Sequence, residues 1–430
     1  MIRILTVMAV GLTLALSGAI GVAQKTPTED RTAVRVDTTQ RPSGDIESQV
    51  AALEAQVRTQ PGDGRTWATL AHVYVERARL NGDPTNYDRA ERALRKAFAL
   101  NGPDDLALVG RAALSAAKHH FRSALHHAQQ ALRVNPYQAV ALAIRVDAMT
   151  ELGRYDGQRR ALAQADRRAP GSAVLTRRSY AEELRGDLAG AGRMLRKALV
   201  LARSGTDRAY LLTQLAELDR KAGQLAASER RLREATTADA RYVPAWASRA
   251  RLAVARGNLA TAERWWRKVN ASSPTFDSAL ELGETYQMSD RPALAERAFD
   301  AAADIVATEA ATGVHGELEV ATLEADHGSA REALRAARVE WSRRHSVHVA
   351  DALAWALFRN DRPLEALRYS SIATRLGTPD SQFWMHRGLI EDALGRSRAA
   401  RRHLAYALHL DPGVRPVLVA AAESALRPSG

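Results

Sequence analysis

The sequence contains no cysteine among its 430 residues. This absence excludes disulfide bonds, zinc sites with thiolate ligands and catalysis by a thiol, and it is compatible with an oxidising or a reducing compartment. Aromatic residues are scarce, at 5% of the chain, whereas 46% of the residues are hydrophobic and 26% are charged. The chain therefore has the composition of an ordinary folded protein, with enough apolar residues for a core.

Runs of Val, Ile and Thr, which are typical of β-strands, are also missing. Alanine, leucine and arginine dominate instead, and all three favour helices. The sequence therefore predicts an all-α fold without a sheet.

The motifs of common enzyme classes are absent as well. The chain has no Gly-x4-Gly-Lys-Ser/Thr phosphate loop, no His-Glu-x2-His zinc motif and no Gly-x-Ser-x-Gly nucleophile elbow. His119, His120, His126 and His127 lie within nine residues, but no carboxylate lies nearby to complete a metal site. We expect these histidines to lie exposed on a helix, and we predict no catalytic residue, no metal and no cofactor.

A repeated helical hairpin organises what is present. Its clearest copy runs over 242–274, where two stretches with helical apolar spacing are separated by Gly257-Asn258 and end at Pro274. Equivalent residues recur 34 positions apart in four pairs: Pro136 and Pro170, His119 and Gly153, Gly223 and Gly257, Asp361 and Gly395. One hairpin cannot bury its apolar faces alone, so we expect the copies to stack.

The first copy resembles a known family. Trp67-x2-Leu70-Ala71-x2-Tyr74 is similar to the Trp-x2-Leu-Gly-x2-Tyr signature of the tetratricopeptide repeat (TPR) family, with Ala in place of Gly. The resemblance extends over about 65–412 and implies a right-handed superhelical solenoid of about ten TPR-like hairpins. We expect 45–430 to form this solenoid, with a leading helix after Asp45 and a C-terminal capping helix over 414–426.

In the TPR family the first helices of the hairpins line a concave groove, which usually binds a peptide or a partner protein. The positions of the first helices that do not pack between hairpins should face this groove. They mix carboxylates, arginines and two tyrosines, and tyrosine and arginine are common binding anchors. The predicted binding residues are Asp147, Tyr180, Glu183, Tyr210, Thr213, Glu217, Arg220, Arg251, Glu284 and Gln287.

The N-terminus differs from the rest of the chain. Residues 1–23 have a basic start, a long apolar run and small residues before Gln24, which is the pattern of a secretory signal peptide or, if uncleaved, of an N-terminal membrane anchor. Residues 24–44 are polar, contain two prolines and have no helical period, so they are interpreted as a flexible linker. We therefore expect a secreted, cell-envelope or membrane-anchored protein that works outside the cytoplasm.

The net charge of +12 arises almost entirely from arginine, since only 6 of the 61 basic residues are lysine. The arginines are spread along the chain and often alternate with Glu or Asp, which is typical of solvated helix surfaces. The sequence thus predicts a non-enzymatic scaffold that binds a protein or peptide in its groove, with no nucleic acid expected. The alternative is an accessory factor that binds an anionic envelope polymer or a lipid surface through its arginines.

Overall fold

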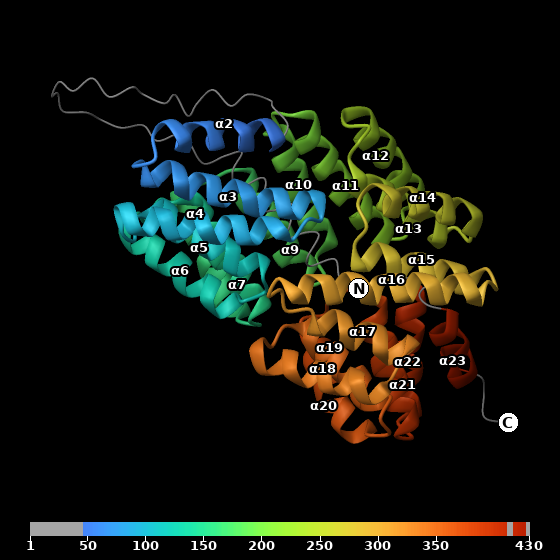
Figure 1. Ribbon diagram of the computed structural model, residues 1–430. Helices are drawn as coiled ribbons and strands as arrows, with labels where there is room; N and C mark the ends of the chain where they lie inside the picture. Colours follow the sequence, from blue (N-terminus) through green and yellow to red (C-terminus); the bar gives the residue numbers. More distant parts are fainter. Residues whose placement is uncertain (1–45, 411–415, 427–430) are drawn as a thin grey trace.

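A computed structural model describes residues 46–410 and 416–426, and the predicted signal or anchor segment and the linker lie outside these residues. The described part consists of helices without strands, so the predicted all-α fold is confirmed. Ten consecutive helix pairs form antiparallel hairpins, as expected (Figure 1). They are α3 (Gly64–Asn81) and α4 (Thr85–Asn101), α5 (Asp105–Ala117) and α6 (Phe121–Val134), α7 (Ala139–Glu151) and α8 (Tyr155–Arg168), α9 (Ser172–Glu183) and α10 (Leu188–Val200), α11 (Gly205–Lys221) and α12 (Leu225–Ala238), α13 (Val243–Ala255) and α14 (Leu259–Ser272), α15 (Phe276–Met288) and α16 (Pro292–Ala311), α17 (Glu317–His327) and α18 (Ala330–Arg343), α19 (Val347–Phe358) and α20 (Pro363–Ala373), and α21 (Ser381–Ala393) and α22 (Ser397–Leu410).

Within the described residues, a single helix lies at each end of the stack. The first is α2 (Ile46–Thr59), which packs on α3, and the last is α23 (Pro416–Leu426), which packs on α21 and α22. Val50 and Val57 of α2 and Leu418 of α23 are buried against these neighbours. The two helices thus cover apolar faces of the terminal hairpins, which is what a solenoid requires for solubility. No helix of the described chain is both long and apolar enough to cross a membrane.

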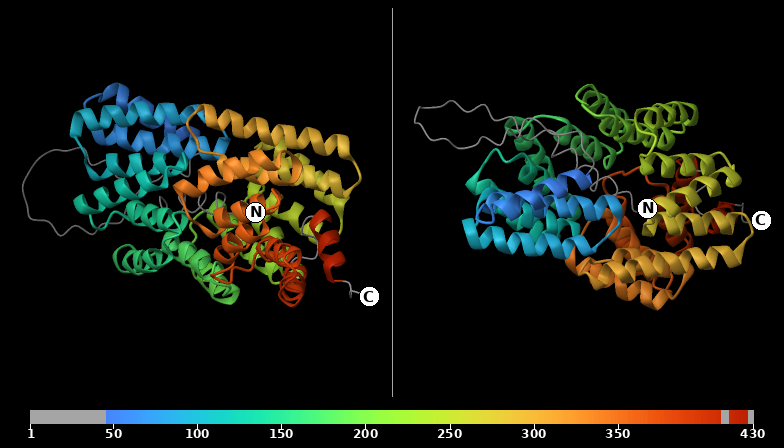
Figure 2. Two further views of the ribbon diagram at one scale, coloured as in Figure 1. Left: turned by 90° about the horizontal axis from the view of Figure 1, so that it is seen from below. Right: turned by 45° about the horizontal axis from the view of Figure 1, so that its top comes forward.

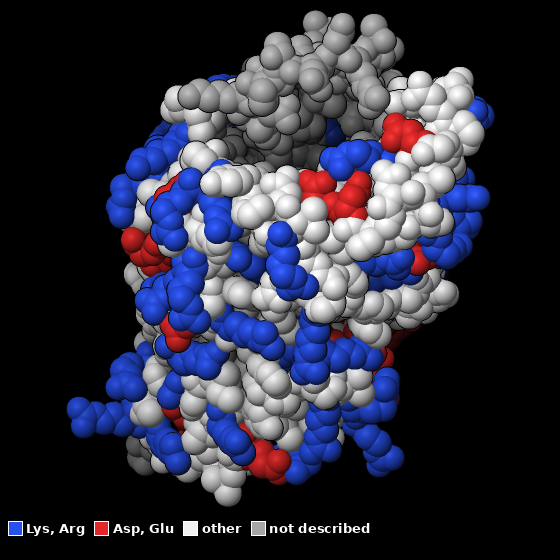
Figure 3. All heavy atoms as spheres, turned by 90° about the vertical axis from the view of Figure 1, so that its left-hand side faces the viewer, with Lys and Arg blue, Asp and Glu red and all other residues white. Residues whose placement is uncertain are grey.

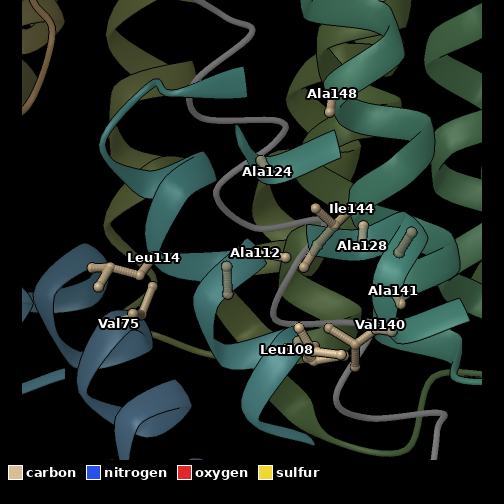
Figure 4. Close-up of a cluster of buried hydrophobic side chains, with 14 of the residues drawn as sticks. Val75, Leu108, Ala112, Leu114, Ala124, Ala128, Val140, Ala141, Ile144 and Ala148 are labelled. Carbon is tan, nitrogen blue, oxygen red and sulfur yellow. The ribbon is translucent and has the colours of Figure 1, made fainter. Parts of the chain in front are cut away.

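Small side chains let the helices approach closely. Between α5, α6 and α7, Ala112, Ala124 and Ala128 are fully buried where the helices cross, and Leu108 and Ile144 fill the spaces beside them (Figure 4). This alternation of small and large residues recurs in the other hairpins and explains why the core needs few aromatic side chains.

The 34-residue spacing arises from the turns within the hairpins. Nine of the ten first helices are followed by a residue with positive φ, and the exception is α17, where Gly328 has φ of −150°. Glycine is the residue that adopts a positive φ without a steric penalty. Gly153, Gly223 and Gly257 have φ of 68°, 72° and 71°, whereas His119 and Asp361 occupy the same place with φ of 60° and 56°. The 34-residue period in the sequence therefore reflects the recurrence of the same backbone conformation at the turns of the hairpins.

The solenoid returns onto itself after one superhelical turn (Figures 1 and 2). The turns inside the second, third and fourth hairpins contact the loops before α17, α19 and α21, respectively. His119 Nδ1 lies 2.6 Å from the His315 carbonyl oxygen, the Tyr155 hydroxyl accepts a hydrogen bond of 2.9 Å from the Val347 amide, and the Thr378 hydroxyl donates one of 2.7 Å to the Leu184 carbonyl. These partners are 196, 192 and 194 residues apart, so one superhelical turn takes just under six 34-residue repeats.

A buried ion-pair cluster lies at the centre of this contact between superhelical turns. The Arg344 guanidinium, 3% exposed, binds both Glu151 of the third hairpin and Glu340 of α18. Tyr155 and Leu184 pack nearby against Val347 and Phe383 in one apolar cluster. We call this contact the inter-turn lock.

The expectation that the four neighbouring histidines lie exposed is wrong for His119, which is 8% exposed. Its place at a turn that docks on another part of the chain buries it, and burial lowers its pKa to about 3. The ring is therefore neutral, and Nδ1–H donates to the His315 carbonyl. His126, seven residues further on in α6, is exposed as expected.

Candidate functional site

The inter-turn lock converts the open groove of the solenoid into a central chamber. The described residues line a partly open cavity of about 860 Å³. Its lining comes mainly from the first helices of successive hairpins, from α3 to α19. Among the second helices α16 contributes most: at 20 residues it is the longest described helix, and it brings Asp304, Ile305, Thr308 and Glu309 of its C-terminal part to the wall. The size is within the range of pockets that enclose a small ligand or a short segment of a chain.

Seven of the ten predicted binding residues line this chamber, and three do not. The seven come from four successive first helices, α7, α9, α11 and α13; they are Asp147, Tyr180, Glu183, Tyr210, Thr213, Glu217 and Arg251. Arg220 lies outside the lining and forms an ion pair of 3.1 Å with Glu217. Glu284 and Gln287 of α15 also lie outside it, and Gln287 is exposed. On α15 the N-terminal end of the helix reaches the chamber and the middle of the helix does not.

The predicted residues of α7 and α9 are held by ion pairs. The Arg177 guanidinium binds the Asp147 carboxylate through two hydrogen bonds, of 2.8 Å from Nε and 2.6 Å from Nη2. Burial raises the pKa of Asp147, and Arg177 opposes that effect. Glu183 pairs in the same way with Lys221 of the next first helix. These carboxylates are therefore neutralised within the protein.

The predicted residues of α11 and α13 form a second network. Arg251 donates from Nε and Nη2 to Glu281, at 2.9 and 2.5 Å, and its Nη1 lies 3.7 Å from a Glu217 oxygen. The same guanidinium stands over the ring of Trp266, 5.3 Å from its centroid. Burial opposes the charge of Arg251, but the two carboxylates raise its pKa. Arg251 is thus a structural cation that joins α13 to α15 and α11.

Tyr210 has a different role from the one predicted. It is 2% exposed and packs in an apolar cluster with Leu211 and Leu215, so most of its ring is part of the core. Tyr180 and Tyr242, by contrast, line the chamber with hydroxyl groups that have no hydrogen-bond partner in the structure. Burial raises the pKa of all three tyrosines, which therefore stay neutral.

Several lining residues were not predicted from the sequence. Glu151, Arg344 and His348 reach the chamber because the inter-turn lock brings α7 and α19 together. Asp277, Glu309 and Glu319 come from the start of α15, the end of α16 and the start of α17. No sequence signal marks the first group, because their proximity depends on the superhelical turn. The long alanine-rich stretch before Gly316 was a signal for the second group, since it is the extension of α16 that forms this wall.

Glu319 is the most unusual of these residues. Its side chain is 3% exposed, and neither carboxylate oxygen accepts a hydrogen bond from another residue. Burial raises its pKa to about 8, although Arg344 acts in the opposite direction. A buried polar group without a partner is unfavourable and is more often found where a ligand supplies the missing partner.

The chamber has the features of a binding site and lacks those of a metal centre. No group of three or more His, Asp or Glu side chains in the described chain is arranged to hold a metal ion. The lining combines apolar faces, aromatic rings and charged groups that are held in place by ion pairs, which suits recognition of an extended ligand.

No family model matches the sequence, and no curated protein matches it. Solved structures with a similar fold exist, and they are predominantly TPR proteins, as the sequence predicted. A tetratricopeptide repeat protein from Parabacteroides merdae is 20% identical, with 59% of this chain and 98% of that chain covered and a TM-score of 0.35. PilF from Pseudomonas aeruginosa is 18% identical, with 49% and 91% covered and a TM-score of 0.37. Yeast Tom70 is 13% identical, with 89% and 96% covered and a TM-score of 0.36. At these values the likeness concerns the fold alone.

Proposed function

We propose that this protein is a non-enzymatic scaffold that works outside the cytoplasm and binds a segment of a partner protein in its central chamber. The observation that carries the proposal is the convergence of side chains from four successive first helices on one cavity of about 860 Å³. A cavity of this size holds a short extended segment and not a folded domain. The absence of catalytic motifs in the sequence supports a non-enzymatic role. The apolar run over 4–22 supports a location outside the cytoplasm.

Obstruction of the chamber tests whether it binds a partner. Ala247 lines the chamber, so Ala247→Trp would fill part of it, whereas Val200→Trp places the same side chain at an outer position that is 85% exposed. We expect affinity capture from the envelope fraction of the producing organism to recover a protein with the native chain and with Val200→Trp, but not with Ala247→Trp. Equal recovery by both variants would contradict binding in the chamber.

Location is tested separately. We expect the protein in the envelope or the medium, with Gln24 as its first residue if the signal is cleaved. A cytoplasmic pool that retains Met1 would refute export without affecting the chamber.

Binding of an anionic polymer or lipid surface remains the second candidate, because Lys and Arg side chains are spread over the outer face seen in Figure 3. Such binding should weaken steeply with added salt and should be the same for Ala247→Trp and Val200→Trp. Binding of a segment in the chamber should depend on the obstruction instead.

A further inference from the structure

The chamber has the opposite charge from the chain as a whole. Among the described lining residues ten are Asp or Glu and five are Lys or Arg, although the chain has a net charge of +12. The basic side chains of the molecule therefore lie mostly on the outside, as Figure 3 shows for one face. An acidic interior within a basic molecule is a selective feature, because it repels anions at the place where the partner is proposed to bind.

The cations of the lining are already paired. Lys221 is bound by Glu183, and Arg251 and Arg344 are each bound by carboxylates on two sides. Arg79 pairs with Glu76, and Arg241 lies exposed. The charges of these four paired cations are therefore already compensated, so none of them is available to bind an anionic ligand.

Three carboxylates of the lining lie on neighbouring helix ends. We call Asp277, Glu309 and Glu319 the acidic cluster; none of them forms an ion pair with another described residue. They lie where the start of α15, the end of α16 and the start of α17 pack together around Phe276, Val306 and Leu323. Glu309 acts electrostatically on both of the others and raises the pKa of each.

The acidic cluster shows a second, independent sign of a missing ligand. Glu319 lines the chamber and is only 3% exposed. Neither of its carboxylate oxygens accepts a hydrogen bond from another residue. The hydroxyl of Tyr242, another lining residue that is 9% exposed, is also without a partner. A ligand with several N–H donors would satisfy these acceptors.

The walls of the chamber suit an organic cation. The described residues contain no arrangement of three or more metal-ligating side chains, and the chamber walls include the aromatic side chains of Tyr180 and Tyr242. An alkylammonium group presents three donors to carboxylates, and its aliphatic stem packs on such rings.

We propose that the chamber selects a lysine-containing segment of its partner and that the ammonium group of the lysine binds at the acidic cluster, with Glu319 as its main acceptor. This proposal rests on the proposed function, since it specifies the chemistry of the segment. A free polyamine offers the same ammonium chemistry and is the alternative source of the cation.

Calorimetric titration of the full chain with three probes tests the proposal. The probes are an N-acetylated, C-amidated hexapeptide of alternating lysine and alanine, its counterpart with glutamate in place of lysine, and spermidine. We expect the lysine peptide to bind and the glutamate peptide not to bind. Glu319→Gln should weaken the lysine peptide at least tenfold, whereas Asp156→Asn, which removes the same charge at an exposed outer position, should leave its affinity within twofold. Glu319→Gln keeps the shape of the side chain and replaces a buried carboxyl, which is mainly protonated at pH 7, by a neutral amide, so it should not impair folding.

A second readout separates a direct contact from a general charge effect. Binding of an ammonium group favours the ionised form of Glu319, so the lysine peptide should release protons into the buffer near pH 7 and should bind more tightly as the pH rises to about 8. Arg344, Glu340 and Glu309 face this carboxyl and should shift the midpoint without changing the direction. Proton release should be lost in Glu319→Gln.

The outcomes distinguish the two proposals. Binding of the glutamate peptide that Ala247→Trp abolishes would leave the scaffold function intact and overturn the cationic ligand. Spermidine binding without binding of the lysine peptide would overturn the peptide as the source of the cation. If the native partner is captured equally by Ala247→Trp and Val200→Trp, the scaffold function fails, and this inference fails with it.

Discussion

Replacement of Gly153 by alanine tests whether the inter-turn lock closes the solenoid. Gly153 has φ of 68°, and an added Cβ would lie 2.1 Å from the carbonyl oxygen of His345, 192 residues further along the chain. Gly223 occupies the equivalent turn two hairpins later, with φ of 72° and no atom within 4 Å of an added Cβ. Gly153→Ala and Gly223→Ala therefore share the backbone strain and differ only in the contact.

The expected magnitudes follow from these two effects. Alanine in the left-handed conformation costs about 1 kcal/mol in both variants. In Gly153→Ala the clash is with backbone atoms that have no rotamer to escape into, so the loop that carries Arg344 must move away. Removing Glu151 from the buried Arg344 costs on the order of 3 kcal/mol. We therefore expect Gly153→Ala to lower the free energy of unfolding by about 3 kcal/mol more than Gly223→Ala does.

Urea unfolding followed by circular dichroism measures the difference in the free energy of unfolding between the two variants. Small-angle X-ray scattering measures whether the two superhelical turns have separated. The radius of gyration should increase for Gly153→Ala, because the two superhelical turns separate, and should stay unchanged for Gly223→Ala. Equal destabilisation of the two variants, to within about 0.5 kcal/mol, together with unchanged scattering would refute the inter-turn lock as a stabilising contact.

Three further predictions concern single side chains. Glu151→Ala leaves Arg344 buried with one carboxylate fewer and should lower the free energy of unfolding by about 3–5 kcal/mol, whereas Asp156→Ala, at an exposed ion pair, should change it by less than about 0.5 kcal/mol in the same urea titration. Trp266→Ala empties a fully buried site and should cost about 3–5 kcal/mol, while thermal unfolding of a Tyr137→Ala control, 66% exposed, should match the native protein. The pKa of Glu319 is raised from 4.5 when unfolded to about 8 when folded, so its contribution to stability is complete below pH 4.5 and is lost as the pH rises to about 8. The stability of the native chain minus that of Glu319→Gln should therefore fall between about pH 5 and pH 8, and a constant difference would contradict the burial of this carboxyl.

The local structure of this protein is determined by its sequence. The 34-residue spacing predicted the hairpins because it reflects a turn residue with positive φ in nine of the ten copies, as at Gly153 and Gly223. The helical spacing of the apolar residues also placed seven of the ten predicted side chains on the inner wall, because within a regular hairpin the packed face defines the opposite face.

Contacts between distant repeats were decided by the tertiary structure. The pattern in each repeat does not specify the small rotation between neighbouring hairpins, and that rotation, added over nearly six repeats, brings Glu151 to Arg344 and buries His119. It also explains why Gly223, identical in turn type to Gly153, contacts no distant loop. The sequence determined the hairpins and their inner faces; the accumulated rotation of the stack made those faces into a chamber and placed Glu319 in its wall.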